Sequence, residues 1–321
     1  MTAPTTKAVN LLVDHMHKSA KGNTAAGLKR GFRAVEGDDR LARQALSYLD
    51  VFGYLGDVAG DWKDISLGDI IDAIKQFQGF FGLKKSGQLC AKTVKAMEQP
   101  RCGCPDIIRD RHKCARGLKE FINTNLPRWR KTGVFYQIRD YLPNISKTDF
   151  ESVVYNAFQA WTRYGNIEVN PVRRQGQQAD IIISTGRGPR DNFDGPSGTL
   201  AWAYLPDGRD NQLLCKFDLD ETWILNAQQR GILLDAVATH EFGHLMGLDH
   251  SKVQSALMAP YYNAAIRVPQ QQDDIPRFQA RYGIRPDGGG GNPPSPPPGG
   301  DSQVVIRGWF TSVELDGHKV V

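Results

Sequence analysis

The segment H-E-F-G-H-L-M-G-L-D-H, from His240 to His250, has the pattern H-E-x-x-H-x-x-G-x-x-H. His240 and His244 are four residues apart, so a helix places both imidazoles on one face, one turn apart. Gly247 allows the chain to leave the helix, because glycine adopts left-handed dihedrals without a steric penalty. The turn can then bring His250 round as a third nitrogen ligand. Three histidines leave one position of a tetrahedral Zn²⁺ open, which is typical of a catalytic site.

Glu241 supplies the second half of this chemistry. Zinc lowers the pKa of its bound water to roughly 7. Glu241 is placed to take the proton of that water as general base, and the hydroxide can then attack a peptide carbonyl. The alternative is a buried helix whose histidines have only structural partners, a risk that a bare H-E-x-x-H pattern carries. The extended pattern fixes more positions and therefore favours a zinc peptidase.

A second run, A-L-M-A-P-Y-Y at 256–262, follows the motif. Together the two runs resemble the matrixins, the matrix metalloproteinases among the metzincins. The resemblance implies an α/β (α+β) catalytic domain with a twisted mixed sheet and a zinc helix. It also implies that Met258 forms the Met-turn beneath the metal. Leu200, Pro260 and Tyr262 would then line the pocket for the substrate residue that follows the scissile bond.

The hydrophobic pattern upstream of the motif agrees with such a domain. Short apolar runs at 134–138, 167–169 and 179–184 predict strands. The stretch at 147–164 has the 3.6-residue period of an amphipathic helix. We therefore expect the catalytic domain to span 131–284.

Residues 37–106 are expected to form a separate helical domain. Apolar residues recur at helical spacing in three stretches, and Ser66 with Asp69 three residues later predicts a capping box at the start of the second. The three-helix pattern resembles the matrixin propeptide, which is itself similar to peptidoglycan-binding modules. Cys90 departs from that resemblance, because the fold often carries an aspartate there.

The run P-R-C-G-C-P-D at 100–106 closes this domain and resembles the matrixin cysteine switch, P-R-C-G-x-P-D. A thiolate is a strong zinc ligand, so Cys102 in the open coordination position would displace the water and hold the enzyme inactive. The resemblance also implies that Arg101 and Asp106 pair. The alternative for a lone cysteine is a small core residue. Cys104 is unusual at its position and could compete for zinc, pair with another cysteine or stay free.

A glycine-rich run at 193–203 and an acidic run at 217–223 resemble the calcium loop of the family and its acidic partner segment. Calcium prefers carboxylate and backbone carbonyl oxygens. The resemblance therefore implies a calcium site formed by Asp194, Gly195, Ser197, Thr199, Asp218 and Glu221. The alternative is a glycine-rich turn beside a solvated acidic strand end.

Matrixins also carry a second, structural zinc, held by three histidines and an aspartate. Trp202 and Lys216 stand at two of those histidine positions in this chain, and only the three motif histidines lie in the expected catalytic domain. We therefore expect one catalytic zinc, a calcium ion and no structural zinc. Lys216, or a packing contact of Trp202, would fill the gap.

The remaining segments are expected to connect or flank these domains. Residues 1–36 are expected to be a flexible N-terminal segment, 107–130 an activation linker, 285–300 a Pro/Gly linker and 301–321 a short C-terminal tail. With one cysteine assigned to zinc, the other four could form two disulfides or stay reduced. These are Cys90, Cys104, Cys114 and Cys215.

The motif and the resemblance imply protein or peptide substrates, and the composition predicts no nucleic-acid partner. The net charge is +5 and the basic residues are scattered, which predicts a solvated surface. No apolar run approaches the ~18 residues of a membrane span. No secretory signal is recognisable at the start of the sequence. The resemblance nevertheless implies an extracellular, secreted protein that acts on matrix or cell-wall material.

The first hypothesis is thus a latent zinc endopeptidase. One alternative from another class is a catalytically silent zinc-binding interaction module, and a second is an N-terminal module that binds polysaccharide or cell wall. Intact Glu241 and Cys102 argue against the silent module, because an inactive enzyme requires neither a general base nor an inhibitor.

Overall fold

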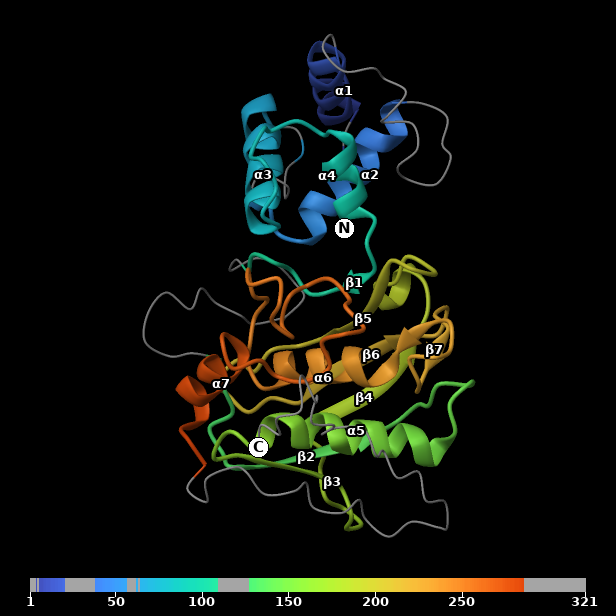
Figure 1. Ribbon diagram of the computed structural model, residues 1–321, viewed down its shortest axis with the longest axis vertical. Coiled ribbons are helices and arrows are strands. Elements are labelled where there is room, and N and C mark those ends of the chain that lie inside the picture. The colour runs from blue at the N-terminus through green and yellow to red at the C-terminus, as the bar shows by residue number, and fades with distance from the viewer. Residues whose placement is uncertain are drawn as a thin grey trace, which may run out of the picture.

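The chain folds as a helical unit stacked on a larger α/β unit (Figure 1). The computed structural model describes residues 4, 6–20, 38–56, 62, 64–108 and 127–285. Most of the expected activation linker, the Pro/Gly linker from 286, the tail at 301–321 and Cys114 lie outside the described residues. None of the described helices is both long and apolar enough to cross a bilayer.

The helical unit contains four described helices around one apolar core. They are α1 (Thr6–Ala20), α2 (Asp38–Val51), α3 (Leu67–Phe80) and α4 (Ala91–Met97). The predicted capping box starts α3, since the Asp69 N–H donates to Ser66 Oγ and the Asp69 carboxylate accepts from the Ser66 N–H. This local signal is confirmed because both partners lie within one turn of the chain.

Helix α1 differs from the expectation of a flexible segment at 1–36. Val9 and Leu12 are fully buried in the core that α1 shares with α2 and α3. Thr6–Ala20 therefore forms a helix within the segment expected to be flexible, and the unit has four described helices rather than three. The apolar pattern of α1 is short, and its partner surface is remote in sequence, so the pattern alone did not predict this burial.

The α/β unit is built on a six-stranded sheet with the order β1-β5-β6-β4-β2-β3. Neighbouring strands are parallel except for the antiparallel pair β5 and β6. This arrangement confirms the expected mixed sheet of an α/β metzincin-type domain. The strands are β1 (Arg101–Cys102), β2 (Gly133–Ile138), β3 (Glu168–Pro171), β4 (Ile181–Gly186), β5 (Thr199–Ala203) and β6 (Leu213–Asp218).

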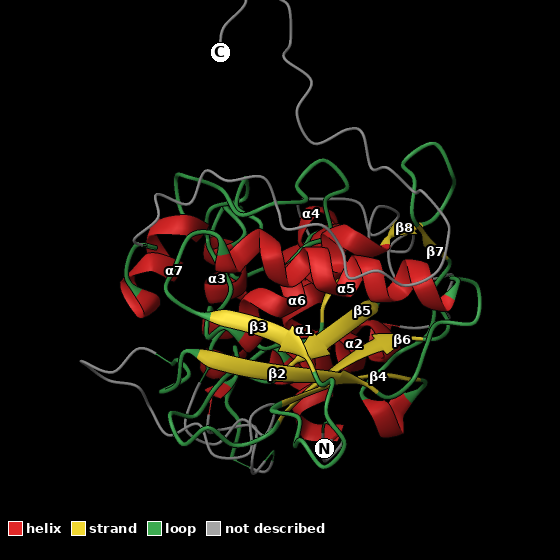
Figure 2. Cartoon of the chain, turned by 90° about the horizontal axis from the view of Figure 1, so that it is seen from below, coloured by secondary structure: helices red, strands yellow, loops and turns green. Residues whose placement is uncertain are grey.

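Two helices, α5 (Lys147–Thr162) and α6 (Leu234–Leu245), lie together on one face of this sheet (Figure 2). Phe158 of α5 stacks on Phe242 of α6, with ring centroids 4.0 Å apart. Trp161 of α5 donates a hydrogen bond to the carbonyl of Thr239, 2.7 Å away. The motif helix α6 is therefore fixed from the side opposite to its histidines.

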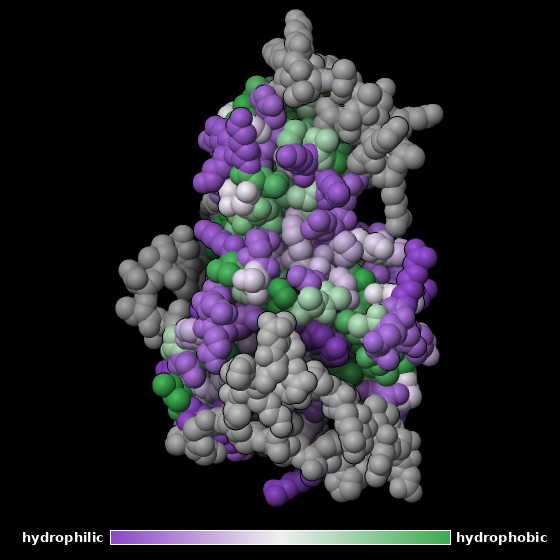
Figure 3. Space-filling model, in the orientation of Figure 1, coloured by the Kyte–Doolittle hydropathy of each residue, from purple (hydrophilic) through white to green (hydrophobic). Residues whose placement is uncertain are grey.

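Shorter elements complete the unit. The small sheet β7 (Trp223–Ile224) and β8 (Ile232–Leu233) leads directly into α6, and α7 (Asp274–Tyr282) packs near its end. A 3-10 turn, η3 (Pro189–Asp191), precedes β5. On the face seen in Figure 3, hydrophilic and apolar side chains are interspersed over both units, as is usual for a surface in contact with water.

Candidate active site

The end of α6 has the geometry that the motif predicts. The helix ends at Leu245, and Gly247 follows with φ of 92°. A Cβ at Gly247 would lie 1.9 Å from the carbonyl oxygen of Pro127, so both the dihedral and the space require glycine. The turn brings His250 back beside the two helix histidines.

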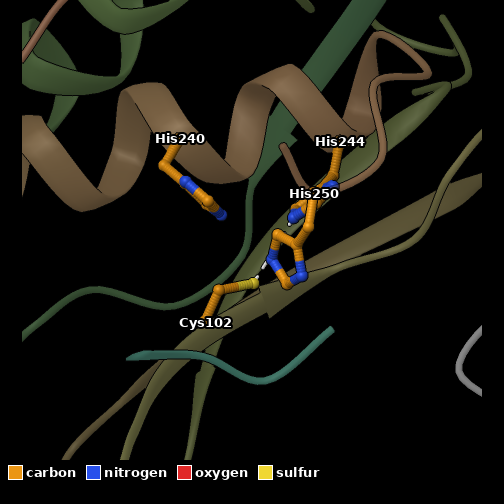
Figure 4. A group of neighbouring side chains, drawn as sticks. All are labelled: Cys102, His240, His244 and His250. Carbon is orange, nitrogen blue, oxygen red and sulfur yellow. Dashed lines mark hydrogen bonds between the residues drawn. The ribbon is translucent and has the colours of Figure 1, made fainter. Parts of the chain in front are cut away.

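Four potential ligand atoms converge at this place. The side chains of Cys102, His240, His244 and His250 point toward one another (Figure 4), and their ligand atoms all lie within 4.8 Å of one another. The Nε2 atoms of His240 and His250 are buried and have no hydrogen-bond partner. Buried polar atoms without partners are costly, which is expected where a metal ion supplies the missing contact.

The spacing within this cluster fits a tetrahedral zinc ion. Cys102 Sγ lies 3.4 Å from His244 Nε2. Zn–S bonds of about 2.3 Å and Zn–N bonds of about 2.0–2.1 Å at a tetrahedral angle place sulfur and nitrogen about 3.5 Å apart. The donor set of three imidazoles and a thiol is also one that zinc prefers.

Each imidazole is oriented by an acceptor at Nδ1. His240 donates to the carbonyl of Leu257 at 2.7 Å, and His244 donates to that of Leu248 at 2.6 Å. His250 donates to Asp106 Oδ1 at 2.8 Å. A proton on Nδ1 leaves the Nε2 lone pair of a neutral ring for a metal.

Burial favours that neutral form. It lowers the pKa of His240 to about 3, with the neighbouring His250 as the next cause. Burial likewise lowers the pKa values of His244 and His250. All three rings are therefore unprotonated near neutral pH and can act as ligands.

Glu241 lies fully buried beside the cluster. Both of its carboxylate oxygens are buried and have no hydrogen-bond partner. Burial raises its pKa to about 8. The position of Glu241 among these potential ligand atoms places it to accept and return a proton, and this is the role of a general base.

The turn at Met258 lies directly beneath the histidines. Met258 is fully buried, and a Cβ added to Gly243 of α6 would lie 2.3 Å from its Sδ. Asp274 accepts the backbone N–H groups of Leu257 and Met258, at 2.7 and 3.1 Å. Since Leu257 in turn orients His240, Asp274 supports the metal site through this turn. Sequence analysis missed Asp274, because an aspartate at a helix start reads as a surface residue.

A pocket of about 30 Å³ opens next to Glu241. Its lining contains the three residues that the resemblance assigns to a substrate pocket, together with mainly apolar neighbours. Tyr262 is held in the wall because its hydroxyl accepts the N–H of Leu233 at 2.9 Å. The lining includes Leu200, Val237, Leu257, Pro260, Tyr262 and Ile266.

The segment around Cys102 lies as a strand between β5 on one side and residues 260–262, which form a wall of the pocket, on the other. β1 pairs in parallel with β5, with Cys102 opposite Ala201. On its other side, the Cys102 N–H donates to the carbonyl of Pro260 at 2.9 Å. The Tyr262 N–H donates to the carbonyl of Pro100, also at 2.9 Å. The segment therefore has backbone bonds on both sides and covers the metal cluster.

Arg101 and Asp106 pair, as the resemblance implies. Their two contacts measure 2.5 and 3.1 Å, and both side chains are almost fully buried. Tyr54 donates to the same carboxylate at 2.6 Å, and the guanidinium lies 3.5 Å from the ring centroid of Phe52. Burial acts to raise the pKa of Asp106, but Arg101 and His250 outweigh it and hold that pKa below its usual value.

Asp106 thus connects the helical unit to His250 of the cluster, a link absent from the sequence prediction. It contacts Tyr54, Arg101 and His250 at once. Carboxylate acceptors of this kind orient metal-bound histidines and raise their basicity. The aromatic surroundings of Arg101 were also missed, because they come from distant parts of the chain, namely Tyr48, Phe52, Phe81 and Tyr261.

We expect Arg101→Ala to destabilise the intact chain by about 3–5 kcal/mol, because it leaves the buried Asp106 carboxylate without its main counter-charge. Urea unfolding followed by tryptophan fluorescence measures this change. Lys75→Ala is the matched control, since its ion pair with Asp72 is exposed and we expect a change within about 1 kcal/mol. Equal midpoints for the two variants would contradict a structural role for the buried pair.

The expected calcium residues gather at the end of β6. Asp194 accepts the N–H of Thr199 at 2.7 Å, and Glu221 accepts that of Ser197 at 2.5 Å. Asp218 is fully buried, and its Oδ2 has no partner. Burial raises the pKa of Asp218 to about 6, and the nearby Asp220 and Asp194 carboxylates contribute.

The loop backbone is shaped around this group of carboxylates. Gly195 has φ of 89°, and a Cβ on Gly198 would lie 2.2 Å from the Asp194 carboxylate. These three acidic side chains do not form a set within 4.8 Å, since both such sets in the described part of the chain lie at the histidine motif.

Lys216 and Trp202 both contact Asp191. The Lys216 ammonium forms an ion pair with the Asp191 carboxylate, and Trp202 Nε1 donates to the Asp191 carbonyl at 2.7 Å. The hydrogen bond from Lys216 and the positive charge of its ammonium both lower the pKa of Asp191. The two residues at the expected histidine positions therefore tie η3 to β5 and β6 by an ion pair and a hydrogen bond.

Four described cysteines are free thiols: Cys90, Cys102, Cys104 and Cys215. Cys90 is exposed, whereas the other three are buried. Cys104 Sγ donates to the carbonyl of Ala203 at 3.1 Å. No disulfide joins the described cysteines, and Cys104 also belongs to a second set of potential ligand atoms with Cys102, Glu241 and His244.

Comparisons with known proteins agree with this geometry. The family model described as Matrixin matches residues 128–283. An interstitial collagenase of Equus caballus is 42% identical over 218 residues, which cover 67% of this chain and 43% of the relative.

Two further relatives extend the comparison toward the helical unit. An interstitial collagenase of Oryctolagus cuniculus is 38% identical over 265 residues, or 79% of this chain and 52% of the relative. Matrix metalloproteinase-20 of Homo sapiens is 35% identical over 255 residues, which cover 76% of this chain and 49% of the relative. The chain spans about half the length of the curated relatives it matches. With the zinc-type cluster on α6 and the match over 128–283, the chain belongs to the matrixin family.

Proposed function

We propose that this chain is a latent zinc-dependent endopeptidase. The observation that carries the proposal is the ligand cluster itself, in which Cys102 of the N-terminal part lies within 4.8 Å of the three motif histidines. A thiol in that position occupies the place where a catalytic site keeps a water or a substrate. The same sequence segment fills the substrate groove as a strand.

His240, His244 and His250 would hold the zinc ion, with Cys102 as the fourth ligand in the latent form. A zinc ion bound there supplies a water of lowered pKa and polarises the substrate carbonyl. Glu241 takes the proton from the attacking water and returns it to the leaving amine. The position of its carboxylate beside the ligand atoms supports both transfers.

The groove supports a protein or peptide substrate bound as an extended strand. The Cys102 segment already uses the backbone of β5 on one side and the carbonyl of Pro260 on the other, and a substrate can use the same groups by β-strand addition. The adjoining pocket favours an apolar side chain after the scissile bond. Names such as interstitial collagenase among the relatives support an extracellular protein substrate.

The experiment that tests the function is cleavage of a quenched fluorescent peptide before and after treatment with a thiol-reactive mercurial. We expect no cleavage by the intact zinc-loaded chain and cleavage after treatment. A silent zinc-binding module would bind zinc and stay inactive in both states. Glu241, buried and unpartnered beside the cluster, favours the enzyme over that module.

We expect calcium to stabilise the catalytic unit through Asp194, Asp218 and Glu221. A bound cation relieves the unpaired, buried Asp218 carboxylate, and a ligand at 100 times its Kd adds about 2.7 kcal/mol. Differential scanning fluorimetry with and without a calcium chelator measures the effect. Asp218→Asn should abolish the response to the chelator, whereas Asp72→Asn on the helical unit should leave it intact. A chelator response in Asp218→Asn equal to that of the native chain would argue against the site.

We expect one zinc ion per chain, because Lys216 and Trp202 stand at two sequence positions where the family has histidine ligands, and both contact Asp191. An ammonium placed against that carboxylate repels a cation. Elemental analysis after dialysis measures the stoichiometry, which should fall to zero in His244→Ala and stay at one in Lys216→Ala. Two zinc ions in the native chain would rule the proposal out.

A further inference from the structure

We propose that Cys102 and Cys104 form a redox pair whose oxidation to a disulfide releases the metal ligand and opens the latent site without cleavage of the chain. The inference rests on the proposed latent function. It assigns a role to Cys104, a buried thiol that the proposed mechanism does not use. The two cysteines are separated only by Gly103.

The two thiols already lie side by side. Their sulfur atoms belong to a second set of ligand atoms, with Glu241 and His244, that all lie within 4.8 Å of one another. The Cys104 N–H donates to Cys102 Sγ at 3.3 Å. Consecutive Cα atoms are about 3.8 Å apart, so residues two apart are at most about 7.6 Å apart. Disulfides require a Cα separation of roughly 4.4–6.8 Å, and two residues this close in sequence can reach it.

Oxidation must remove Cys102 from its proposed bond to zinc, whereas Cys104 has only a weak contact to give up. Cys102 Sγ contacts His244 Nε2, and Cys104 Sγ donates to the carbonyl of Ala203. A disulfide replaces both contacts, and the loss of the Cys104 bond is small because thiols are weak donors. Gly103 in between adds no side chain, and a Cβ there would lie 2.5 Å from Thr199 Cγ2.

A small oxidant has a route to Cys102. The pocket of about 30 Å³ beside Glu241 is lined by Cys102 and not by Cys104. A cavity of roughly 10–15 Å³ holds one water, so the space suffices for hydrogen peroxide. Cys102 is therefore the thiol that meets the oxidant, and Cys104 is the thiol that resolves the product.

The chemistry balances with hydrogen peroxide as the oxidant. The Cys102 thiolate attacks one peroxide oxygen, the O–O bond breaks, and sulfenic acid and one water form with one proton from solvent. The Cys104 sulfur then attacks the Cys102 sulfur, the S–O bond breaks, and the hydroxide leaves as water with the Cys104 proton. In total the thiolate and the thiol lose two electrons, and peroxide takes the Cys104 proton and the solvent proton as it is reduced to two waters.

The disulfide has no thiolate to offer a metal. Cys102 is then withdrawn from the open coordination position, while the Arg101–Asp106 ion pair can keep the segment near the groove. Unlike cleavage, the change is reversible by a dithiol. A ring closed over one intervening residue is strained, and strained disulfides are the labile and regulatory ones.

The test treats the intact zinc-loaded chain with hydrogen peroxide and maps its peptides by mass spectrometry. We expect loss of two hydrogens, a cross-link between Cys102 and Cys104, retained zinc, and a rise in peptide cleavage of at least about tenfold that dithiothreitol reverses. Cys104→Ser should instead add oxygen to Cys102 beyond the sulfenic acid, and dithiothreitol should not restore latency. Cys215→Ser and Cys90→Ser are the matched controls and should behave as the native chain.

Two results would overturn the inference. One is a native chain in which Cys102 and Cys104 remain unlinked after peroxide while the mercurial still activates it. The other is a Cys104→Ser chain that is activated and reversed like the native one. A cross-link that forms while neither peroxide nor mercurial gives peptide cleavage would support the redox pair and refute the latent peptidase instead.

Discussion

Glu241→Ala lowers kcat/KM for a peptide substrate by about 10²–10⁴-fold in the activated protein, the range that a positioned general base contributes. The expectation follows from a carboxylate that is buried next to three histidines and has no hydrogen-bond partner of its own. Steady-state cleavage of a quenched peptide after mercurial treatment measures it. Zinc content should stay at the native value, because Glu241 is not among the four ligand residues.

Glu168→Gln is the matched control for this variant. Glu168 is exposed on β3, at the far edge of the sheet from β1, so kcat/KM should not change. The thermal midpoint of Glu241→Ala should also not fall, because removal of an unpartnered carboxylate breaks no hydrogen bond. Native turnover in Glu241→Ala, with zinc bound, would show that another group takes the proton.

Cys102→Ser removes latency, and we expect the uncleaved chain to hydrolyse the peptide at least about tenfold faster than the native zymogen. An inhibitory ligand that silences a site occupies it more than nine-tenths of the time. Its loss therefore raises the rate of cleavage at least about tenfold. A serine hydroxyl is a poor zinc ligand beside a thiolate. Mercurial treatment should give no further activation of this variant.

The measurement is the initial rate of the freshly purified chain, with gel analysis to show that it is intact. Cys90→Ser is the control, because Cys90 is an exposed thiol at the start of α4 and should leave latency unchanged. If the intact Cys102→Ser chain cleaves the peptide as slowly as the native chain, a feature other than Cys102 blocks the site. The strand that β1 forms in the groove is the next candidate.

Sequence alone determined the local parts of the site. The spacing of His240 and His244, the glycine turn at Gly247 and the capping box at Ser66 were all predicted from sequence, and the described structure has each. The helix period at 147–164 and the strands at 134–138 and 179–184 were found within a few residues. Such features depend on dihedrals and contacts within one or two turns, which neighbouring residues specify.

Only the tertiary structure brought in the partners that orient these residues. Asp106 reaches His250 across 144 positions of sequence, and Asp274 holds the turn at Met258. Arg101 is enclosed by aromatic rings of the helical unit. No periodicity links residues so far apart, because each contact exists only after two units or two elements have packed.

The place of α1 and of Cys104 was decided in the same way. The apolar face of α1 is fixed by what α2 and α3 present to it, and Cys104 is buried against the backbone of Ala203 in β5. Sequence gives the chemistry of each side chain and the geometry of its immediate neighbours. Burial and distant partners determine which thiols, carboxylates and imidazoles meet, because those depend on the packing of the whole chain.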